Sequence, residues 1–475
     1  MRYRIERDSL GERQVPAEAY YGIETLRGKE NFEITKRGIC RQLIKALAIV
    51  KKSAAKANID AGNIDEKVGK AIMLACDEIL NGRLHGQFVT DLIQGGAGTS
   101  INMNANEVIA NRANELMGGK KGVYDFVHPN DHVNFGQSTN DVIQTAGKIA
   151  VVKQLKKLQV ELKKLYNSYL DKAKEFENII KMGRTHLQEA LPIRLGQEFE
   201  AYASALSRDM KRIDTTIDAL LEVNMGATAI GTGLNANEKY IKKVILHLSK
   251  FSGESVKQAK NLIDATRNLD VLGQASSVLK LLATNLSKTA SDLRLMASTG
   301  MNGYSEILLP NVQPGSSIMP GKYNPVIPEM VNQVCFYVMG LDVTITKAIE
   351  AGQLELNVFE PIILMSLFEQ ITTLRRAART FNNLAITDMK ASHHVAHFQT
   401  ENSIFFITAL SPHIGHDMAC NIINEALSSG KTIKEIVMEK ALLSEDVIDA
   451  ILDVKNMTTP GIVGEDLLKK KSEKA

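Results

Sequence analysis

The chain has 475 residues, 44% of them hydrophobic, so it can bury a large core and is long enough for about three domains. Its 57 basic and 54 acidic residues leave a net charge of +3, which favours neither nucleic acid nor an anionic membrane as a partner. The four cysteines are scattered, which indicates reduced, packed thiols in a cytoplasmic protein. The charged start and the lack of a long apolar run predict neither a leader nor a membrane span, so a small molecule is the expected partner.

Hydrophobic periodicity predicts an all-α fold built around a central bundle of long helices. Only 11 prolines occur, and apolar residues recur at three- and four-residue steps over long stretches. These stretches predict helices over 149–169, 195–220, 268–297 and from about 328 into the 350s. Each is longer than the ~11–12 residues of a mean helix, so we expect the helices to pack against one another. Strand-like alternation is confined to short pieces near Arg4 and Phe32.

Four polar segments interrupt the helical pattern and are predicted to be irregular. They are QGGAGTSINMNANE (94–107), HPNDHVNFGQSTND (128–141), GRTHLQEALP (183–192) and QPGSSIMPGKYNP (313–325). The side chains of interest in them are hydroxyls, amides, one lysine and the imidazole of the third segment: Thr99, Ser100, Ser138, Thr139, Asn140, Thr185, His186, Ser316, Ser317, Lys322 and Asn324. If these groups converge, they would bind carboxylates through directed hydrogen bonds, with Lys322 supplying the charge. The expected ligand is a small dicarboxylate.

The last of these segments also suggests a base. A Gly-Ser-Ser followed closely by Pro-Gly-Lys forms a loop whose backbone amides can face an anion, including a serine alkoxide. Ser316 or Ser317 is therefore a candidate base, and His186 is either a structural or a catalytic imidazole.

Competing interpretations of single motifs are weaker. The segment GGAGTS lacks the lysine of a nucleotide-binding loop and follows no βα unit. His128 and His132 have the spacing of a helical metal pair, but Pro129 lies between them and a third ligand is missing. The histidines at 393, 394 and 397 are expected to be exposed helix residues rather than ligands.

The segment GSSIMPGKYNP (315–325) resembles the signature GSSxMPxKxN of the fumarase/aspartase superfamily. GTSINMNANEV and HPNDHVNFGQSTND resemble the first and second regions of that superfamily, in the same order. The resemblance implies an all-α, three-domain fold with an N-terminal domain (1–140), a central long-helix domain (141–395) and a small helical C-terminal domain (396–475). It also implies a homotetramer whose helical core is formed by four central domains, with each active site shared between three subunits.

Within the superfamily, several flanking segments resemble those of aspartases. They are YYGIETLRGKENF (20–32), GTSINMN, NPVIPE and the C-terminal MTTPGIVGEDLL. The implied activity is reversible deamination of L-aspartate to fumarate and ammonium, by removal of a Cβ proton through an aci-carboxylate intermediate. A class II fumarase is the alternative, and a δ-crystallin-like structural protein is the non-enzyme one. The resemblance implies no organic cofactor and at most a divalent cation such as Mg²⁺ as an activator.

The resemblance also implies a role for each site residue. Ser316 corresponds to the base, and His186 is the second residue assigned to catalysis. Lys322, Asn324 and Thr185 correspond to groups that hold the α-carboxylate. The residues around the amino group and the β-carboxylate are Thr99, Ser138, Thr139, Asn140 and His186, with Ser317 donating to the β-carboxylate beside the base. Glu329 matches the glutamate that pairs with the histidine in fumarases.

The chain departs from the superfamily pattern in two places. Tyr323 stands where valine is usual, and Ile143-Gln144 replace a common aromatic-proline pair. Because the aligned polar groups remain, we expect altered packing near the site rather than lost activity.

Overall fold

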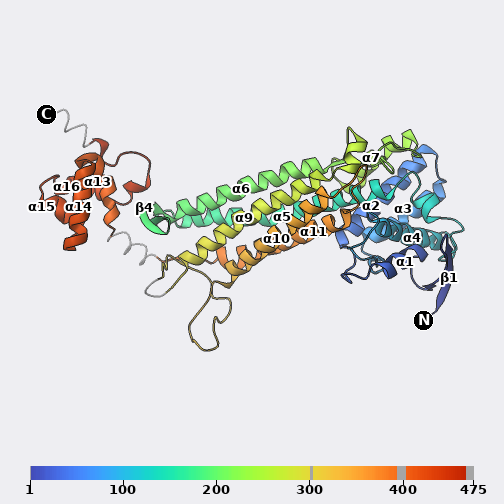
Figure 1. The fold of residues 1–475 in the computed structure, drawn as a ribbon, viewed down its shortest axis with the longest axis horizontal. Helices are drawn as coiled ribbons and strands as arrows, with labels where there is room; N and C mark the ends of the chain where they lie inside the picture. The colour runs from blue at the N-terminus through green and yellow to red at the C-terminus, as the bar shows by residue number, and fades with distance from the viewer. Residues whose placement is uncertain (1, 300–302, 393–402, 467–475) are drawn as a thin grey trace. The chain divides into compact units, whose positions relative to one another are not determined.

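The computed structural model describes residues 2–299, 303–392 and 403–466, and over these residues it confirms the all-α prediction. The strands form four two-stranded sheets: β1 (Tyr3–Asp8) with β2 (Gly11–Pro16), β3 (Ile180–Thr185) with β4 (Gln188–Arg194), β5 (Glu222–Val223) with β6 (Lys257–Gln258), and β7 (Ile307–Leu308) with β8 (Lys390–Ala391). The β5–β6 pair is parallel and the other three are antiparallel. Most of the remaining described residues are helical, and loops connect the helices (Figure 1).

The described chain divides into two compact units that interleave along the sequence. The first unit comprises Met1–Glu161, Asp209–Thr284 and Gln333–Arg376, and the second comprises Leu162–Arg208, Asn285–Asn332 and Ala377–Ala475. Each long helix therefore contributes residues to both units. The three-domain division stays a prediction, and its boundary at 395 lies outside the described residues, as do the histidines at 393, 394 and 397.

The first unit is built on α1 (Ile23–Asn31), α2 (Arg41–Ala61), α3 (Glu66–Leu80), α4 (Thr99–Leu116), α7 (Glu238–Ser252) and α8 (Leu262–Arg267). Local chemistry sets several helix ends. Asp65 caps α3, since its Oδ1 accepts from the amides of Lys67 at 2.8 Å and Val68 at 3.4 Å. Helix α2 ends at Gly62, whose φ of 75° is the left-handed conformation that terminates many helices.

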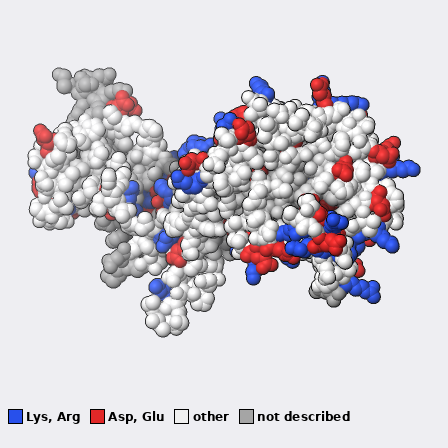
Figure 2. All heavy atoms as spheres, turned by 45° about the vertical axis from the view of Figure 1, so that its right-hand side comes forward, with Lys and Arg blue, Asp and Glu red and all other residues white. Residues whose placement is uncertain are grey.

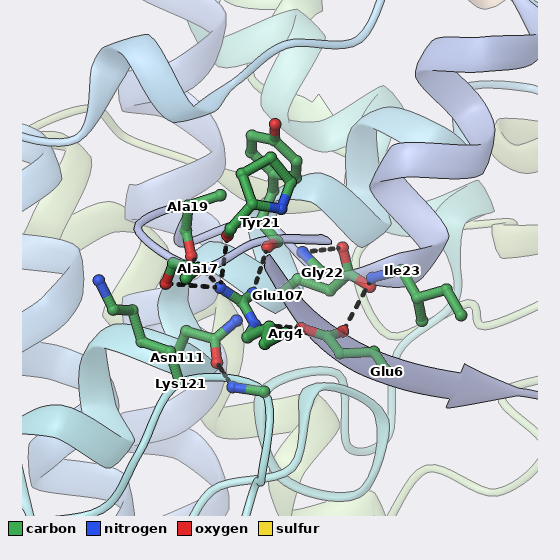
Figure 3. A network of polar contacts seen from close by, with 12 residues as sticks. Arg4, Glu6, Ala17, Ala19, Tyr21, Gly22, Ile23, Glu107, Asn111 and Lys121 are labelled. Carbon is green, nitrogen blue, oxygen red and sulfur yellow. Dashed lines mark hydrogen bonds and ion pairs between the residues drawn. The ribbon is translucent and has the colours of Figure 1, made fainter. Parts of the chain in front are cut away.

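A buried polar network ties the N-terminal hairpin to α1 and α4 (Figure 3). Glu107 of α4 accepts hydrogen bonds from the amides of Gly22 at 2.8 Å and Glu24 at 2.9 Å. Amides at the start of a helix such as α1 have no carbonyl partner within the helix, so Glu107 satisfies them. Glu6 of β1 accepts from the next amide, that of Ile23, at 2.9 Å, and Arg4 pairs with Glu6 at 2.7 Å. The network therefore anchors α4, the helix that begins at the predicted site residue Thr99.

The long helices are α5 (Thr139–Glu175), α6 (Leu195–Leu220), α9 (Asp270–Met296), α10 (Val326–Glu350) and α11 (Glu360–Phe381). Within the first unit, Ser276 of α9 donates to Asp342 of α10 at 2.7 Å, and Gln370 of α11 donates to Ser276 at 3.1 Å. Within the second unit, Asn332 of α10 donates to Ser287 of α9 at 2.9 Å. The four long helices predicted from periodicity are thus confirmed, and α11 is a fifth.

The C-terminal segment of the second unit has its own small core. It is formed by α13 (Ile407–Ile414), α14 (His416–Ser429), α15 (Ile433–Glu439) and α16 (Glu445–Leu452). Apolar residues of these helices, including Leu410, Ile422, Ile436 and Ile448, are fully buried against one another. A capping box at Thr432 and Glu435 starts α15.

Several local predictions were wrong. Phe32 lies directly after α1 and not in a strand. Residues 99–107 are helical, because Gly98 ends the loop and α4 begins at Thr99. Residues 183–192 form most of the β3–β4 hairpin, since a two-residue turn joins two short strands that have few apolar residues in alternation. None of the four cysteines, all of which lie within the described residues, forms a disulfide, but Cys420 is exposed rather than packed.

Candidate active site

The predicted residues Ser138, Thr139 and Asn140 lie at the start of α5, in the first unit. Ser138 Oγ accepts from the amide of Asn140 at 3.2 Å, and Asp141 Oδ1 accepts from the amide of Ser138 at 3.0 Å. Asp141, in the third helical position, thus binds the N-cap amide as the acidic residue of a capping box does, while the Ser138 hydroxyl binds the amide of the second helical position. The segment is therefore held at a helix N-terminus, where free amides favour a bound anion.

The hydrogen bonds of these side chains determine which atoms remain able to donate to a ligand and which remain able to accept from it. Asn140 Nδ2 donates to the carbonyl of Ala229 at 2.7 Å, which leaves Asn140 Oδ1 available as an acceptor. Thr139 Oγ1 accepts from Asn102 Nδ2 at 3.3 Å. Because Ser138 and Thr139 both accept at oxygen, each keeps its hydroxyl proton for a further partner. The segment thus offers two donors and one acceptor.

Ser138 and Thr139 line a cleft of about 530 Å³ within the first unit, a volume that suits a small organic ligand. The opposite wall comes from a loop before α7. The lining residues are Asn134, Gly136, Gln137, Ser138 and Thr139 on one side and Thr228, Ala229, Ile230, Thr232, Leu234 and Asn235 on the other. The described lining has hydroxyls and amides but no lysine, arginine or candidate base.

The loop that forms this second wall was not predicted from the sequence. Asp141 Oδ2 accepts from the amides of Gly226 at 3.2 Å and Thr228 at 3.1 Å, so one buried carboxylate joins the loop to the start of α5. The available signal was the run MGATAIGTGLN, whose glycines at 226, 231 and 233 all have positive φ. This run contains glycine, alanine and threonine, which are the kinds of small and hydroxyl residues found in the four polar segments described above.

Thr99 is the first residue of α4 and also belongs to the first unit. Its Oγ1 donates to the carbonyl of Gly96 at 2.6 Å, and its side chain is exposed. The residue before it, Gly98, has a φ of 87°, and a Cβ there would lie 3.2 Å from the side chain of Ile143. Ile143 and Gln144 are both buried, and the altered packing expected from this departure from the superfamily pattern stays a prediction.

In the second unit, Thr185 and His186 lie at the tip of the β3–β4 hairpin. His186 and Leu187 have φ values of 54° and 62°, as a type I′ turn requires at both central positions. The base of the hairpin is held by Lys181, which pairs with Glu306 at 2.8 Å, and by an ion pair between Arg184 and Glu306. Thr185 and His186 are both exposed at this tip.

The loop between β7 and α10 carries the candidate base. Ser316 Oγ accepts from the amides of Ile318 and Met319, each at 3.3 Å. The two ends of the loop are joined by the amide of Gly315, which donates to the carbonyl of Lys322 at 3.0 Å. Two amides facing one serine oxygen would stabilise an alkoxide there, as the sequence predicted.

The remaining predicted residues of the second unit surround this serine in sequence. Ser317 and Lys322 are exposed, and Asn324 Nδ2 donates to the carbonyl of Gly315 at 3.0 Å. Glu329, in the first turn of α10, lies 3.8 Å from Arg294. Its pairing with His186 stays a prediction.

The histidine pair considered as a metal site has a local role instead. His132 Nδ1 accepts from the amide of His128 at 2.8 Å, and His128 Nδ1 accepts from the amides of Asn130 and Asp131. These bonds stabilise the short π-helix at Pro129–Val133. Over the described ranges, we find no cluster of three or more His, Cys, Asp or Glu side chains that could hold a metal ion.

Two observations concern nucleic acid and membranes as partners. Acidic and basic side chains are interspersed over the described part of the face in Figure 2, so a continuous basic surface for nucleic acid is not visible there. None of the helices within residues 2–299, 303–392 and 403–466 is both long and apolar enough to span a membrane.

Comparison with known proteins places this geometry in a family. A family model described as Lyase matches residues 11–340, and one described as Fumarase C C-terminus matches residues 406–459. The chain is 51% identical over 468 residues to the aspartate ammonia-lyase of Bacillus subtilis strain 168, covering 98% of each chain. The chain belongs to this lyase family. The aspartate ammonia-lyase of Escherichia coli strain K12 is 46% identical, with 96% of each chain covered.

Solved structures of the lyase family share the fold. A fumarate lyase:delta crystallin from Brucella melitensis, bound to cobalt, superposes with a TM-score of 0.94 at 46% identity, covering 97% of this chain and 100% of that one. A class II fumarase from Schistosoma mansoni gives the same TM-score and coverage at 35% identity. The predicted superfamily and the predicted fold class are confirmed.

Proposed function

We propose that this lyase is an aspartate ammonia-lyase, which reversibly converts L-aspartate to fumarate and ammonium. The observation that carries the proposal is the polarity of the Ser138–Asn140 segment at the start of α5, whose Ser138 and Thr139 line the cleft. Ser138 and Thr139 offer hydroxyl donors to a carboxylate, while Asn140 offers a carbonyl oxygen to an ammonium, which has three donors and no acceptor. The 46–51% identity to aspartate ammonia-lyases over nearly the whole chain supports the same choice.

The proposed mechanism begins with the Ser316 alkoxide, which removes a proton from Cβ. The electron pair of the C–H bond then moves into the β-carboxylate, giving an aci-carboxylate with a second negative charge. Donors such as Thr99, Ser138, Thr139 and Ser317 stabilise that charge, and loss of one such donor typically costs about 10²–10³ in rate. Lys322, Asn324 and Thr185 hold the α-carboxylate.

In the second step the electron pair returns to form the double bond of fumarate, and the Cα–N bond breaks. Nitrogen leaves with its electron pair as ammonia and takes up a proton to become ammonium. Because the amino group already carries three protons, no strong general acid is needed. His186, as a neutral imidazole, accepts a hydrogen bond from the substrate ammonium.

We propose a homotetramer with active sites shared between three subunits. The cleft of the first unit is lined by donors but by no base, whereas Ser316 and Lys322 lie on a loop of the second unit. The long helices also expose large apolar side chains, including Phe336 and Val343 of α10, each 62% exposed. Such surfaces favour packing against another copy. Light scattering on purified protein should give the mass of a tetramer.

We propose that the reaction needs no organic cofactor and that a divalent cation such as Mg²⁺ is at most an activator. Dialysis against EDTA should leave turnover at saturating aspartate, and added Mg²⁺ should change rate or affinity without being essential. Complete and Mg²⁺-reversible loss of activity would contradict this. We also propose a cytoplasmic location, which the free thiol of the exposed Cys420 fits.

The substrate is tested by assaying one preparation with L-aspartate, L-malate, D-aspartate and L-asparagine, following fumarate and ammonium separately. We expect turnover of L-aspartate alone, because asparagine lacks the anionic β-carboxylate and malate lacks the ammonium. A class II fumarase is the second candidate, favoured by the superposition on the Schistosoma mansoni enzyme. Efficient hydration of fumarate without release of ammonium from aspartate would replace the proposal with that one.

A further inference from the structure

A buried lysine lies behind the cleft of the first unit. The side chain of Lys51, on α2, is fully buried, and its Nζ donates to Asn134 Oδ1 at 2.8 Å and to Gln137 Oε1 at 3.0 Å. Asn134 and Gln137 line the cleft, whereas Lys51 does not. Lys51 therefore contacts the wall of the cleft from its inner side, one residue removed from any ligand.

The bonds of Lys51 determine how neighbouring amides are oriented. An ammonium only donates, so Asn134 and Gln137 must turn their carbonyl oxygens toward it. Asn134 Oδ1 also accepts from Asn102 Nδ2 at 3.2 Å, and the same Nδ2 donates to Thr139 Oγ1 at 3.3 Å. The chain from Lys51 to Thr139 therefore leaves the Thr139 hydroxyl proton free to donate into the cleft.

Lys51 is a costly residue to bury, which indicates that it has a role beyond filling space. A buried ammonium is destabilising unless it is paired, and Lys51 has only neutral hydrogen-bond partners. The nearby carboxylate of Asp141 is already bound by the backbone amides of Ser138, Gly226 and Thr228. Asp141 attracts Lys51 without satisfying its hydrogen bonds.

Burial also affects how the group titrates. Desolvation lowers the pKa of Lys51 to about 7, and attraction to Asp141 of α5 opposes this change. Burial raises the pKa of Asp141 to about 6. The other titratable groups around this pair are Cys76 of α3, beside Lys51, and Tyr240 of α7, beside Asp141, and burial raises the pKa of both far enough to keep them neutral.

We propose that Lys51 is a positioning residue for the proposed reaction, whose ammonium orients Asn134 and Gln137 and, through Asn102, directs the Thr139 hydroxyl at the dicarboxylate. The inference rests on the proposed function, because it assigns a dicarboxylate to this cleft. The positive charge behind the wall also favours the aci-carboxylate dianion over the substrate, since the dianion carries one more negative charge. The charge therefore contributes more to kcat than to substrate binding.

The first test compares Lys51→Met with Lys52→Met. Lys52 is the adjacent lysine on α2 and pairs with Asp77 at 2.5 Å, away from the cleft. We expect Lys51→Met to lower kcat/KM for L-aspartate about ten- to a hundredfold, mostly through kcat, as outer residues that orient a site usually do. Lys52→Met should stay within about twofold of the parent. A folded Lys51→Met protein within about twofold of the parent would overturn the inference.

The second test is the pH profile of Lys51→Arg, since an arginine stays charged where a lysine does not. In the parent, kcat/KM should fall as the pH rises and Lys51 loses its proton, and this fall should occur at a pH below the ordinary lysine range. In Lys51→Arg the same fall, the alkaline limb of the profile, should move to higher pH. A purely structural lysine would leave the limb in place. An unmoved limb, or failure of both Lys51 variants to fold, would assign Lys51 to the fold alone and overturn the inference.

Failure of the proposed function can be distinguished from failure of the Lys51 inference. If the parent releases no ammonium from aspartate but hydrates fumarate, the substrate assignment is wrong, and the same variants are then compared on fumarate hydration. Loss of that activity in Lys51→Met but not in Lys52→Met would still support a positioning role. Equal activities would reject it independently of the substrate.

Discussion

The start of α5 and the loop at 315–324 contribute to the proposed site in different ways. Ser138–Asp141 is held by groups from two other parts of the first unit. These are Asn102 of α4 and the loop before α7, which contributes the amides of Gly226 and Thr228 and the carbonyl of Ala229. The hydrogen bonds described for the 315–324 loop, by contrast, run within the loop itself, from Gly315 to Lys322 and from Asn324 to Gly315.

The difference indicates that the two regions have separate roles in the proposed site. Groups that stabilise developing charge must be oriented before the substrate arrives, and a buried network achieves this for Ser138 and Thr139. The proposed base Ser316 needs only a local turn that directs two amides at its oxygen, and the hydrogen bonds of the loop itself provide that turn. Four experiments test this comparison.

The largest expected effect is that of Ser316→Ala. Removing the base should lower kcat by about 10²–10⁴, the usual contribution of general base catalysis, while the protein stays folded and still binds aspartate. Ser317→Ala, at the adjacent position, should retain more activity because it removes one donor and not the base. Steady-state kinetics with calorimetric binding would check both, and Ser316→Ala activity within about tenfold of the parent would reject Ser316 as the base.

Hybrid tetramers test whether the two regions act across chains. Ser138→Ala and Lys322→Ala should each be nearly inactive, but equal amounts mixed by mild denaturation and reassembly should recover activity. If the two residues of a site come from different chains at random, about a quarter of the sites are fully intact. The recovered rate is measured against reassembled parent protein. Verified hybrids that recover nothing would show that both residues act from one chain.

The third experiment compares the stability of the two regions. Asp141→Asn has one side-chain carbonyl oxygen to serve three backbone amides, so it should lower the free energy of unfolding by about 1–3 kcal/mol. Asn324→Ala, in the loop, should change it by less than about 0.5 kcal/mol. Urea denaturation measures both. Asp65→Asn at the exposed cap of α3 is the control, since asparagine caps as well as aspartate. Equal losses in the two regions would contradict the comparison.

The smallest expected effect concerns a buried acid next to Gln144 of α5. Burial raises the pKa of Glu360 from 4.5 to about 8, with attraction to Lys148 opposing this. At a pH between these two pKa values, the folded chain holds a proton on Glu360 that the unfolded chain releases. The free energy of unfolding should therefore fall as the pH rises, by up to about 1.4 kcal/mol per pH unit.

Glu360→Gln removes this titration and should flatten the dependence between about pH 5.5 and about pH 7.5. The exposed Glu350→Gln is the control and should leave the slope unchanged. Urea denaturation at both pH values gives the slopes, and an unchanged slope in Glu360→Gln would show that this carboxyl is ionised in the folded protein.

Much of the fold was predictable, because long helices leave a strong local signal. The stripe of apolar residues from Leu195 to Leu220 coincides with the bounds of α6. Shorter elements were not predicted where the conformation of only a few residues determines whether they form. The β3–β4 hairpin depends on the positive φ of His186 and Leu187, and neither residue type signals such a turn.

The sequence by itself determined the superfamily, the helical fold and the types of side chain at the site, because motif spacing and apolar periodicity are local properties of the chain. Only the tertiary structure decided which of these groups meet. It placed the unpredicted loop at Gly226–Thr228 opposite Ser138, and it buried Lys51 behind Asn134, from a helix some 80 residues earlier in the chain. Orientation of a hydroxyl depends on hydrogen bonds from residues distant in sequence, and these exist only when the helices have packed.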